Sequence, residues 1–292
     1  MELCDLNEIK LLLARHGFQF SKSLGQNFLC DRSIPQQIAE RAGITKDCGV
    51  LEIGPGIGAL SAQLCRCAKK VVAVELDERL TPILRETMAE YDNFTLVQGN
   101  VLKLDLAGLC REQLGEMPVI ACANLPYYIT TPAIEALLEC GCFSKIVVMV
   151  QKEAAERICA HAGQEEYCAF SAQVAYHAQT EIILSVPRDR FVPTPKVDSV
   201  VLRITPWSRY SGNYPKKPVY RVIRAAFGNR RKTLANGLTM EYGSRISKAD
   251  AAALLESLSL PPDIRGERLT VEQFCLLAAA LERKTAFADE RS

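Results

Sequence analysis

The six residues Ala123-Asn124-Leu125-Pro126-Tyr127-Tyr128 combine groups that suit recognition of a flat base carrying an amine. The amide oxygen of Asn124 and the Leu125 carbonyl, held ahead of the rigid Pro126, can each accept one N–H, and the ring of Tyr127 can stack on the base. Asn and Pro are also common in turns that simply close a strand, with tyrosines as packing. The motif alone is therefore compatible with a base-binding site and with a plain turn.

The segments around this motif place it at the end of a strand. The apolar run Pro118-Val119-Ile120-Ala121-Cys122 is typical of a buried strand. Thr130-Thr131-Pro132 suits a helix start, because it supplies a Thr cap and an early proline. Open α/β sheets bind ligands at the carboxyl ends of their parallel strands. The motif therefore stands where a ligand crevice is expected.

A glycine turn earlier in the chain is the second candidate site. Val50–Ile53 is predicted to be a strand, and Gly54-Pro55-Gly56-Ile57-Gly58 the turn into a helix, where glycines permit close approach of a nucleotide-like ligand. Val71–Leu76 is predicted as a second strand, and the Glu75 carboxylate can accept both hydroxyls of a ribose. The spacing Gly54-x-Gly56-x-x-Ala59 also fits a dinucleotide fingerprint, against which the Asn-Leu-Pro-Tyr motif argues.

Two further segments carry candidate ligand contacts. Asn100 follows the predicted strand 94–98 and is either an adenine contact or part of a strand-end turn. Lys22–Leu29 is either a plain loop or a lid, with Asn27 and Leu29 touching a ligand and Lys22 a phosphate.

Phe191 opens a proline-stiffened loop, residues 191–198. It is interpreted either as a hairpin anchor or as the second face of a base sandwich with Tyr127.

Strands and helices alternate along the first two thirds of the chain. The further predicted strands are 118–123, 145–151, 181–186 and 199–204. This alternation predicts an α/β fold with a doubly wound, seven-stranded, largely parallel sheet. We expect one domain over residues 1–205, with residues 1–30 as its N-terminal helix and lid, a linker over 206–218, and a small all-helical domain over 219–292.

Composition excludes several classes of protein. The chain has 292 residues, 48% of them hydrophobic, which indicates a globular protein. We found neither a secretory signal pattern at the start nor an apolar run long enough to cross a bilayer. The 12 cysteines and 3 histidines lack metal-site spacing, so we expect free thiols, no metal and a cytoplasmic location.

Charge is distributed unevenly although the net charge is only +1. From Val186 onward there are 19 basic and 11 acidic residues, a net charge of +8, which leaves −7 for the preceding residues. Arg230, Arg231 and Lys232 are three consecutive cations beside an apolar helix stripe. The C-terminal third is therefore either a polyanion-binding region or an ordinary solvated surface.

Several long motifs occur together in one order that is typical of a known family. They are Lys22-Ser-Leu-Gly-Gln-Asn-Phe-Leu29, Glu52-Ile-Gly-Pro-Gly56, Val74-Glu75-Leu-Asp77, Asn124-Leu-Pro-Tyr127, Gln151-Lys-Glu153, Phe191-x-Pro-x-Pro-Lys-Val-Asp-Ser199 and Phe227-x-x-Arg-Arg-Lys-Thr233. The chain thus resembles the bacterial small-subunit (16S) rRNA adenine dimethyltransferases, well over roughly residues 20–238 and loosely beyond.

The resemblance implies an enzyme dependent on S-adenosylmethionine (SAM), with a Rossmann-like domain of the class I methyltransferase type and a helical C-terminal domain. It implies transfer of two methyl groups to the exocyclic amine of each of two adjacent adenosines near the 3′ end of 16S rRNA. The small ribosomal subunit or its precursor is the implied partner, and we expect a monomer.

The resemblance also assigns roles to residues. The implied SAM contacts are Asn27, Leu29, Gly54, Gly56, Glu75, Asn100 and Asn124, and the implied catalytic set is Asn124, Leu125, Pro126, Tyr127 and Phe191. Lys22, Arg230, Arg231 and Lys232 are the implied RNA contacts. The family commonly has Gly-Asp where this chain has Gly99-Asn100, and we expect the Asn100 amide oxygen to accept from the adenine amine instead.

Three other functions fit part of the same evidence. A related methyltransferase acting on large-subunit (23S) rRNA and conferring antibiotic resistance would share the fold and an Asn-x-Pro-Tyr motif. A ribosome-assembly factor would bind the subunit without catalysis. An NAD-dependent dehydrogenase would use the glycine turn, and stabilisation by NAD in place of SAM would reveal it.

Overall fold

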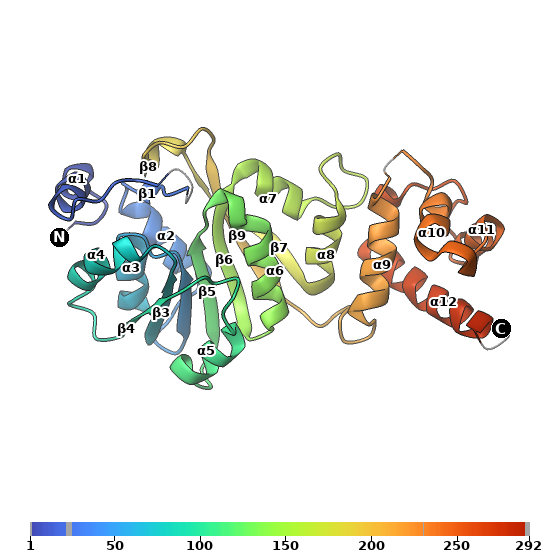
Figure 1. Cartoon of the computed structure of the whole chain (residues 1–292), viewed down its shortest axis with the longest axis horizontal. Coiled ribbons are helices and arrows are strands. Elements are labelled where there is room, and N and C mark those ends of the chain that lie inside the picture. Colours follow the sequence, from blue (N-terminus) through green and yellow to red (C-terminus); the bar gives the residue numbers. More distant parts are fainter. Residues whose placement is uncertain (1, 22–24, 230, 290–292) are drawn as a thin grey trace. The chain divides into compact units, whose positions relative to one another are not determined.

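The structure, a computed structural model, describes residues 2–21, 25–229 and 231–289. The chain divides into two compact units (Figure 1). One consists of Met1–Ala155 and Thr180–Pro206, and the other of Glu156–Gln179 and Trp207–Ser292. Each unit has a hydrophobic core of its own.

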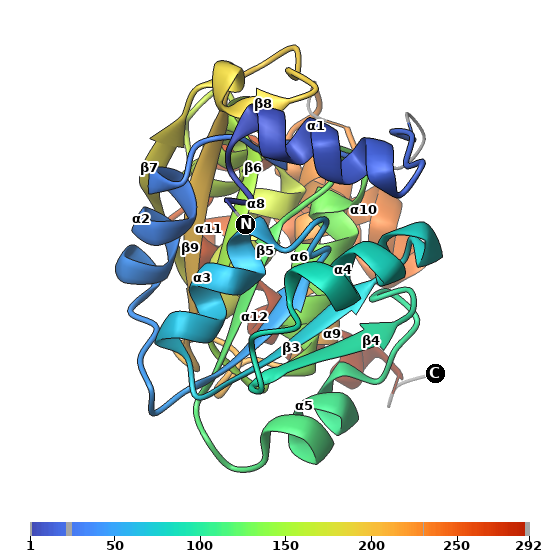
Figure 2. The same cartoon turned by 90° about the vertical axis from the view of Figure 1, so that its left-hand side faces the viewer.

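A seven-stranded sheet with the order β4-β3-β2-β5-β6-β9-β7 is built around the first unit, as predicted (Figures 1 and 2). Its strands are β2 (Gly49–Ile53), β3 (Lys70–Glu75), β4 (Phe94–Gln98), β5 (Val119–Asn124), β6 (Phe143–Gln151), β7 (Ala178–Val186) and β9 (Ser199–Pro206). Strands β4, β3, β2, β5 and β6 run parallel to one another, and β9 is antiparallel to β6. The chain order reverses between β2 and β5, and such a reversal opens a ligand crevice at the carboxyl ends of the strands.

Helices cover both faces of this sheet. Those of the first unit are α1 (Leu6–Arg15), α2 (Ser33–Ala42), α3 (Ala59–Cys67), α4 (Thr81–Thr87), α5 (Leu106–Leu114), α6 (Thr130–Cys140) and the start of α7 (Lys152–Cys159). Apolar residues of α1 to α4 form one core with alternate strand residues such as Val50 and Val71. Helix α5 packs with α6 on the opposite face (Figure 2). Strands buried on both faces explain the continuous apolar runs in the sequence.

A second, very short sheet ties the N-terminal segment to the proline-rich loop. Strand β1 (Phe28–Leu29) pairs antiparallel with β8 (Phe191–Val192). The rings of Phe18, Phe20 and Phe28 pack together just before this pairing, with centroids 5.3–6.1 Å apart. The pairing was not predicted from the sequence, because neither strand is longer than two residues.

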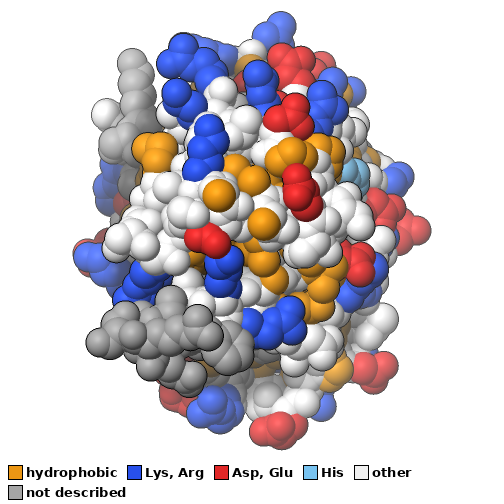
Figure 3. Space-filling view, turned by 90° about the vertical axis from the view of Figure 1, so that its right-hand side faces the viewer, with side chains coloured by type: hydrophobic (Ala, Val, Ile, Leu, Met, Phe, Trp, Pro, Cys, Tyr) orange, Lys and Arg blue, Asp and Glu red, His pale blue; other side chains and the backbone are white. Residues whose placement is uncertain are grey.

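The second unit is helical. It contains the end of α7 and α8 (Ala169–His177), α9 (Lys216–Phe227), α10 (Leu234–Tyr242), α11 (Lys248–Ser257) and α12 (Val271–Asp289). Val219, Val222 and Ile223 of α9 are completely buried, as their helical spacing predicted. The face of this unit drawn in Figure 3 carries Lys and Arg side chains together with Asp and Glu, around a central hydrophobic area.

The contact-based division differs from the expected domain boundaries at two places. Residues 156–179 join the C-terminal helices, because Tyr167 is buried there and its hydroxyl donates to the Leu269 carbonyl at 3.1 Å. Within the expected linker 206–218, the backbone N–H of Trp207 donates to the carbonyl of His177 at 2.9 Å. Tyr210 also belongs to the core of the second unit, so this stretch is part of the helical unit.

Two structural observations bear on the expected class of protein. No helix in residues 2–21, 25–229 and 231–289 is long and apolar enough to cross a membrane. Within the same described residues, no three His, Cys, Asp or Glu side chains are grouped so that they could hold a metal ion.

Candidate active site

One pocket lies at the carboxyl ends of the four parallel strands β4, β3, β2 and β5. Gly54 follows β2, Glu75 ends β3, Asn100 follows β4 and Asn124 ends β5, and all four line this pocket. The structure therefore brings together residues that are up to 70 positions apart in the sequence. The N-terminal segment Gly25–Leu29, which contains the candidates Asn27 and Leu29, closes the pocket on another side.

The glycine turn brings bare backbone to the wall of the pocket. Gly54 and Gly56 have φ values of +68° and +61°, a region in which other residues are strained. A Cβ at Gly54 would meet no atom within 4 Å, so this position faces open space. A Cβ at Gly56 would lie 3.1 Å from the ring of Phe28, so here glycine allows the N-terminal segment to pack against the turn.

Glu75 is a buried carboxylate held by backbone donors. It is 6% exposed, and one carboxylate oxygen accepts the backbone N–H of Asp77 at 2.8 Å. Burial raises the pKa of Glu75, and backbone N–H groups of Asp77 and Gly56 counteract this by stabilising the anion. Such a carboxylate at the end of the second strand of a nucleotide-binding fold suits a ribose diol.

Glu52 is a second buried acid in the pocket, which the sequence analysis did not single out. It is 1% exposed, and its Oε2 atom has no hydrogen-bond partner among the described residues. Burial raises the pKa of Glu52 to about 8, and the nearby charge of Glu75 adds to this effect. An acid within a buried strand, just before the glycine turn, was the signal that could have identified it. The pocket wall thus contains a buried carboxyl group whose Oε2 atom has no hydrogen-bond partner among the described residues.

The side chain of Asn124 is fixed by the N-terminal segment. Its Nδ2 atom donates to the backbone carbonyl of Asn27 at 3.1 Å. Because that bond uses the N–H side of the amide, the Oδ1 atom is the side left to accept a hydrogen bond from a ligand. Asn27 in turn donates from its own Nδ2 to the carbonyl of Gly25 at 3.0 Å, which folds this segment over the pocket.

The two tyrosines of the motif have different environments. Tyr127 is partly buried, and its hydroxyl is hydrogen-bonded to Ser199 Oγ on β9 at 3.0 Å. Tyr128 is 55% exposed at the pocket and is not core packing. Ser199 is buried and was not among the expected site residues, although it ends the Phe191–Ser199 motif.

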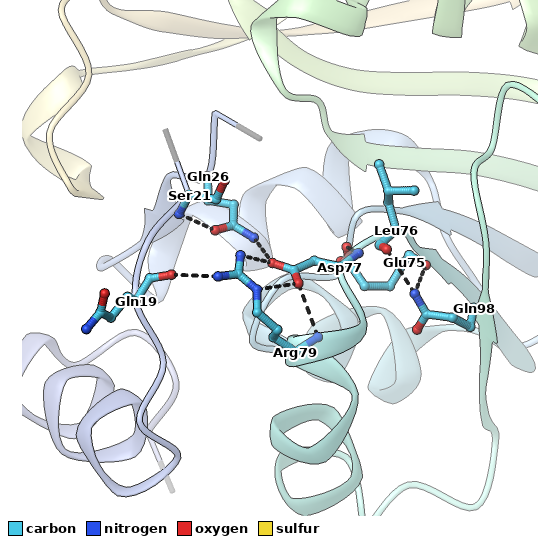
Figure 4. Close-up of polar contacts among 8 residues, drawn as sticks. All are labelled: Gln19, Ser21, Gln26, Glu75, Leu76, Asp77, Arg79 and Gln98. Carbon is cyan, nitrogen blue, oxygen red and sulfur yellow. Dashed lines mark hydrogen bonds and ion pairs between the residues drawn. The ribbon is translucent and has the colours of Figure 1, made fainter. Parts of the chain in front are cut away.

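The amide of Asn100 is oriented by a turn in its own loop. Its Oδ1 atom accepts the backbone N–H of Leu102 at 2.9 Å. An amide oxygen has two lone pairs, so this bond leaves it able to accept a second hydrogen bond, and the expectation that it accepts from an adenine amine stays a prediction. The neighbouring amide of Gln98 donates to the carbonyls of Glu75 and Leu76, which ties the ends of β3 and β4 together (Figure 4).

Asp77 connects the N-terminal segment to the loop that carries Glu75 (Figure 4). Its Oδ2 atom accepts from Gln26 Nε2 at 2.8 Å, and Arg79 forms a bidentate pair with the same carboxylate. Gln26 also accepts the backbone N–H of Ser21 at 3.1 Å. The hydrogen bonds from Arg79 are the main cause of the lowered pKa of Asp77, so the Asp77 carboxylate is ionised at neutral pH.

Some expected site residues lie elsewhere. Phe191 is 3% exposed, lies opposite Leu29 in the β1–β8 pair and belongs to the apolar core, as a hairpin anchor would. It is not among the residues that line the pocket, and its role as a second face for a base stays a prediction. Arg231 and Lys232 are exposed after α9. Lys22 and Arg230 lie outside the described residues.

Solved structures of methyltransferases share this fold. A dimethyladenosine transferase from Plasmodium falciparum superposes with a TM-score of 0.75 at 26% identity, covering 88% of this chain and 98% of that one. A 23S rRNA methyltransferase has a TM-score of 0.67 at 24% identity, covering 87% and 99%, which shows the fold alone. The first unit therefore has the methyltransferase fold, and the expected fold class is confirmed.

The sequence comparisons identify the family. The family described as ribosomal RNA adenine dimethylase matches residues 17–279. The ribosomal RNA small subunit methyltransferase A of Streptococcus sanguinis (strain SK36) is 43% identical over 286 residues, 97% of this chain and 99% of that protein. The corresponding protein of Geobacillus thermodenitrificans (strain NG80-2) is 44% identical over 276 residues, 93% and 94% of the two chains. The chain belongs to the ribosomal RNA adenine dimethylase family.

Membership of this family makes the chain an SAM-dependent rRNA adenine dimethyltransferase, which confirms the expected enzyme class and cofactor and excludes the dehydrogenase alternative. The pocket fits this cofactor. Glu75, whose carboxylate is held by backbone N–H groups, suits its ribose, and the backbone at Gly54 leaves space beside it.

Proposed function

We propose that this enzyme transfers two methyl groups to the exocyclic amine of each of two adjacent adenosines near the 3′ end of 16S rRNA. Near-full-length similarity to small subunit methyltransferases A supports the choice of rRNA. The observation that carries the proposed chemistry is the orientation of Asn124, whose Nδ2 donates to Asn27 and leaves Oδ1 at the pocket as an acceptor.

Asn124 and the Leu125 carbonyl make the target amine reactive in this proposal. The lone pair of an adenine amine is delocalised into the ring, so the planar amine is a poor nucleophile. Two oxygen acceptors that bind its N–H groups favour a pyramidal nitrogen, whose lone pair is available for attack. The same oxygens stabilise positive charge that develops on the nitrogen, and no strong general base is needed to begin the reaction.

Tyr127 holds the target base against these acceptors. The Ser199 hydrogen bond fixes the ring of Tyr127, which can then stack on the base. The electron-rich face of the ring also favours cationic character in the base. SAM, when bound, supplies an electrophilic methyl group, and positioning the amine in line with it can contribute about 7–11 kcal/mol to catalysis.

We propose that the second unit binds the ribosomal RNA. Its support is the net charge of this unit, whose residues 156–179 and 207–292 carry 16 basic and 12 acidic side chains, a net of +4, and the exposed Arg231 and Lys232. The substrate in this proposal is the small ribosomal subunit or a precursor of it. A cytoplasmic, monomeric enzyme fits such a substrate, and both properties stay predictions.

Labelled SAM offered to unmethylated small subunits, and separately to large subunits, tests the proposal. We expect label in dimethyladenosine near the 3′ end of 16S rRNA and no label in 23S rRNA. Label in 23S rRNA alone would assign the chain to the large-subunit alternative. Stable binding to small subunits with no label in either RNA would support a ribosome-assembly factor and refute the enzymatic proposal.

A further inference from the structure

Tyr128 has the most exposed aromatic ring among the side chains that the structure describes. The ring is 55% exposed and also lines the pocket, so it lies at the entrance of the pocket and not in its interior. A single exposed aromatic residue elsewhere on a protein surface needs no special explanation. This one directly follows Asn124–Tyr127, the residues that are proposed to hold the target adenosine.

The rings of Tyr127 and Tyr128 point in different directions. The two tyrosines are consecutive residues of a short 3₁₀ helix, Tyr127–Ile129. Such a helix has three residues per turn, so neighbouring side chains point about 120° apart. The Tyr127 hydroxyl is accordingly hydrogen-bonded to the buried Ser199, whereas the Tyr128 ring is largely exposed. The two rings therefore do not stack on the same base, but they can contact two bases that have separated from each other.

The N-terminal segment supports the Tyr128 ring from one side. A Cβ at Gly25 would lie 3.7 Å from Cδ1 of Tyr128 and 3.8 Å from Cβ of Pro126, which is ordinary van der Waals contact. Gly25 is held in this place because its carbonyl accepts Nδ2 of Asn27, whose own carbonyl accepts Nδ2 of Asn124. A ring supported in this way loses little conformational freedom when a base stacks on it.

We infer that Tyr128 is a substrate-binding residue that stacks on the nucleotide next to the target adenosine. This role rests on the proposed function, because it takes the substrate to be two adjacent adenosines of one RNA strand. A base whose amine reaches Asn124 in the pocket has left the stack of its neighbours. The next base loses a stacking partner and stays close to the entrance, since one phosphate joins it to the target. The Tyr128 ring at the entrance replaces the lost partner.

Stacking on this ring favours an adenosine beside the target. An aromatic side chain can stack on every base, but it holds a purine more strongly than a pyrimidine, because a purine has the larger flat surface. The ring lies on one side of the target site, so it contacts the neighbour on one side of the target, 5′ or 3′. Tyr128 therefore contributes to the choice of a target that is one of two adjacent adenosines.

The variants Tyr128→Ala and Tyr128→Phe test the role of the ring. Methyl transfer from labelled SAM to unmethylated small subunits is measured, together with the affinity for S-adenosyl-L-homocysteine by calorimetry. In Tyr128→Ala we expect the KM for small subunits to rise about fivefold to a hundredfold, the range expected for the loss of stacking on one base. Tyr128→Phe keeps the ring, so its KM should stay within about twofold. The cofactor affinity of both variants should also stay within about twofold, because the ring is assigned to the RNA.

Leu11→Ala is the matched control, because it removes another exposed apolar side chain of the first unit. Leu11 is 66% exposed and is not among the residues that line the pocket. Its variant should keep the original KM. An unchanged KM in Tyr128→Ala would overturn the inference, whether or not the cofactor affinity falls. If Tyr128→Ala does not fold, Tyr128→Ile, which also lacks a flat face, should show the same rise in KM.

Small subunits with uridine in place of one of the two adenosines test which base the ring contacts. Methylation of the remaining adenosine is measured for both such substrates, so that neighbours on the 5′ and 3′ sides are both covered. In the unchanged chain we expect uridine to lower kcat/KM about threefold or more for at least one substrate, and in Tyr128→Ala we expect that loss to disappear.

Equal effects of uridine in the two chains, for both substrates, would overturn the inference and leave the proposed function in place. If the unchanged chain does not methylate 16S rRNA in small subunits that keep both adenosines, the proposed function and the inference are overturned together.

Discussion

At the scale of single residues, the site depends on amides and hydroxyls whose orientation is fixed by a second hydrogen bond. Asn124 is fixed by the Asn27 carbonyl, Asn100 by the Leu102 N–H, and Tyr127 by Ser199. In each case this bond fixes the orientation of the side chain before a ligand binds. Such preorganisation reduces the entropy lost on binding and in the reaction.

The Tyr127–Ser199 bond gives the first prediction. Tyr127→Phe and Ser199→Ala each remove the same hydrogen bond, so each should lower kcat/KM for the RNA substrate about threefold to tenfold. The double variant should be no worse than either single one, because the two changes remove one interaction. SAM affinity measured by calorimetry should not change. Additive losses in the double variant would show that the hydroxyl pair is not what positions the ring.

Glu52 gives a second prediction, on pH and stability. Its pKa is raised from 4.5 to about 8 in the folded chain, so the folded state holds a proton that the unfolded state loses between these values. Stability of the ligand-free chain should therefore fall as pH rises from about 5 to 8 through this group. Glu52→Gln should remove that fall and raise stability at pH 8.5 by on the order of a few kcal/mol.

Thermal unfolding of the ligand-free chain and of Glu52→Gln at pH 5 and pH 8.5 checks this prediction. We expect the difference between the two chains to be larger at pH 8.5. An equal difference at both pH values would mean that Glu52 is ionised in the folded chain throughout this range.

At the scale of elements, Asp77 joins the N-terminal segment to the β3 end (Figure 4). Its backbone N–H bonds Glu75, and its side chain bonds Gln26, which neighbours Asn27. The segment that covers the pocket and the carboxylate within the pocket are therefore held by one residue. This arrangement predicts that cofactor affinity depends on the polarity of the Gln26–Asp77 pair.

Exchanging the polarity of that pair tests the link. Gln26→Glu places two carboxylates together, and Asp77→Asn weakens the acceptor, so each should lower affinity for S-adenosyl-L-homocysteine by about tenfold. The double variant restores a donor and an acceptor in the opposite sense and should recover part of the loss. Calorimetry on the four chains measures this. If the double variant loses as much affinity for S-adenosyl-L-homocysteine as the two single variants together, this hydrogen bond has no direct role in cofactor binding.

The sequence predicted the sheet well because its strands have strong local patterns. Phe94–Gln98 was predicted with both ends correct, and the glycine turn and Glu75 were found at their strand ends. The β1–β8 pair was missed, since Leu29 and Phe191 are 162 positions apart and no local pattern joins them. The packing of residues 156–179 with the C-terminal helices was not predicted for the same reason, because their partners are distant in the sequence.

The candidate site was partly predictable. Residue types at strand ends identified Asn124 and Glu75, because ligand crevices occur there. The directions of the amide groups were not predictable, since they depend on the backbone of Asn27 and Leu102. Glu52 was missed as a site residue because a buried strand position normally indicates packing.

At the scale of the whole molecule, the two parts of the sequence have opposite net charges. Residues 1–185, which form most of the sheet, have a net charge of −7, and the residues from Val186 onward have a net charge of +8. We expect Ala at Arg230, Arg231 and Lys232 to weaken binding to small subunits. It should reduce the slope of log affinity against log salt by roughly two to three, if each cation contacts one phosphate. Binding measured by filtration at several salt concentrations checks the slope.

A triple variant of exposed cations in the first unit, Lys10, Lys103 and Arg111, is the matched control and should keep the original slope. If the slope of the variant with Ala at Arg230, Arg231 and Lys232 is unchanged, these three cations are ordinary solvated surface residues and do not bind the RNA.

The most direct test of the account is the Asn124→Ala variant, measured for both methyl transfer and cofactor affinity. We expect methyl transfer to small subunits to fall by at least about a hundredfold, because one of two acceptors for the target amine is removed. SAM affinity by calorimetry should stay within about threefold. Methyl transfer at the original rate, with SAM affinity unchanged, would contradict the central claim that the Asn124 oxygen makes the amine reactive.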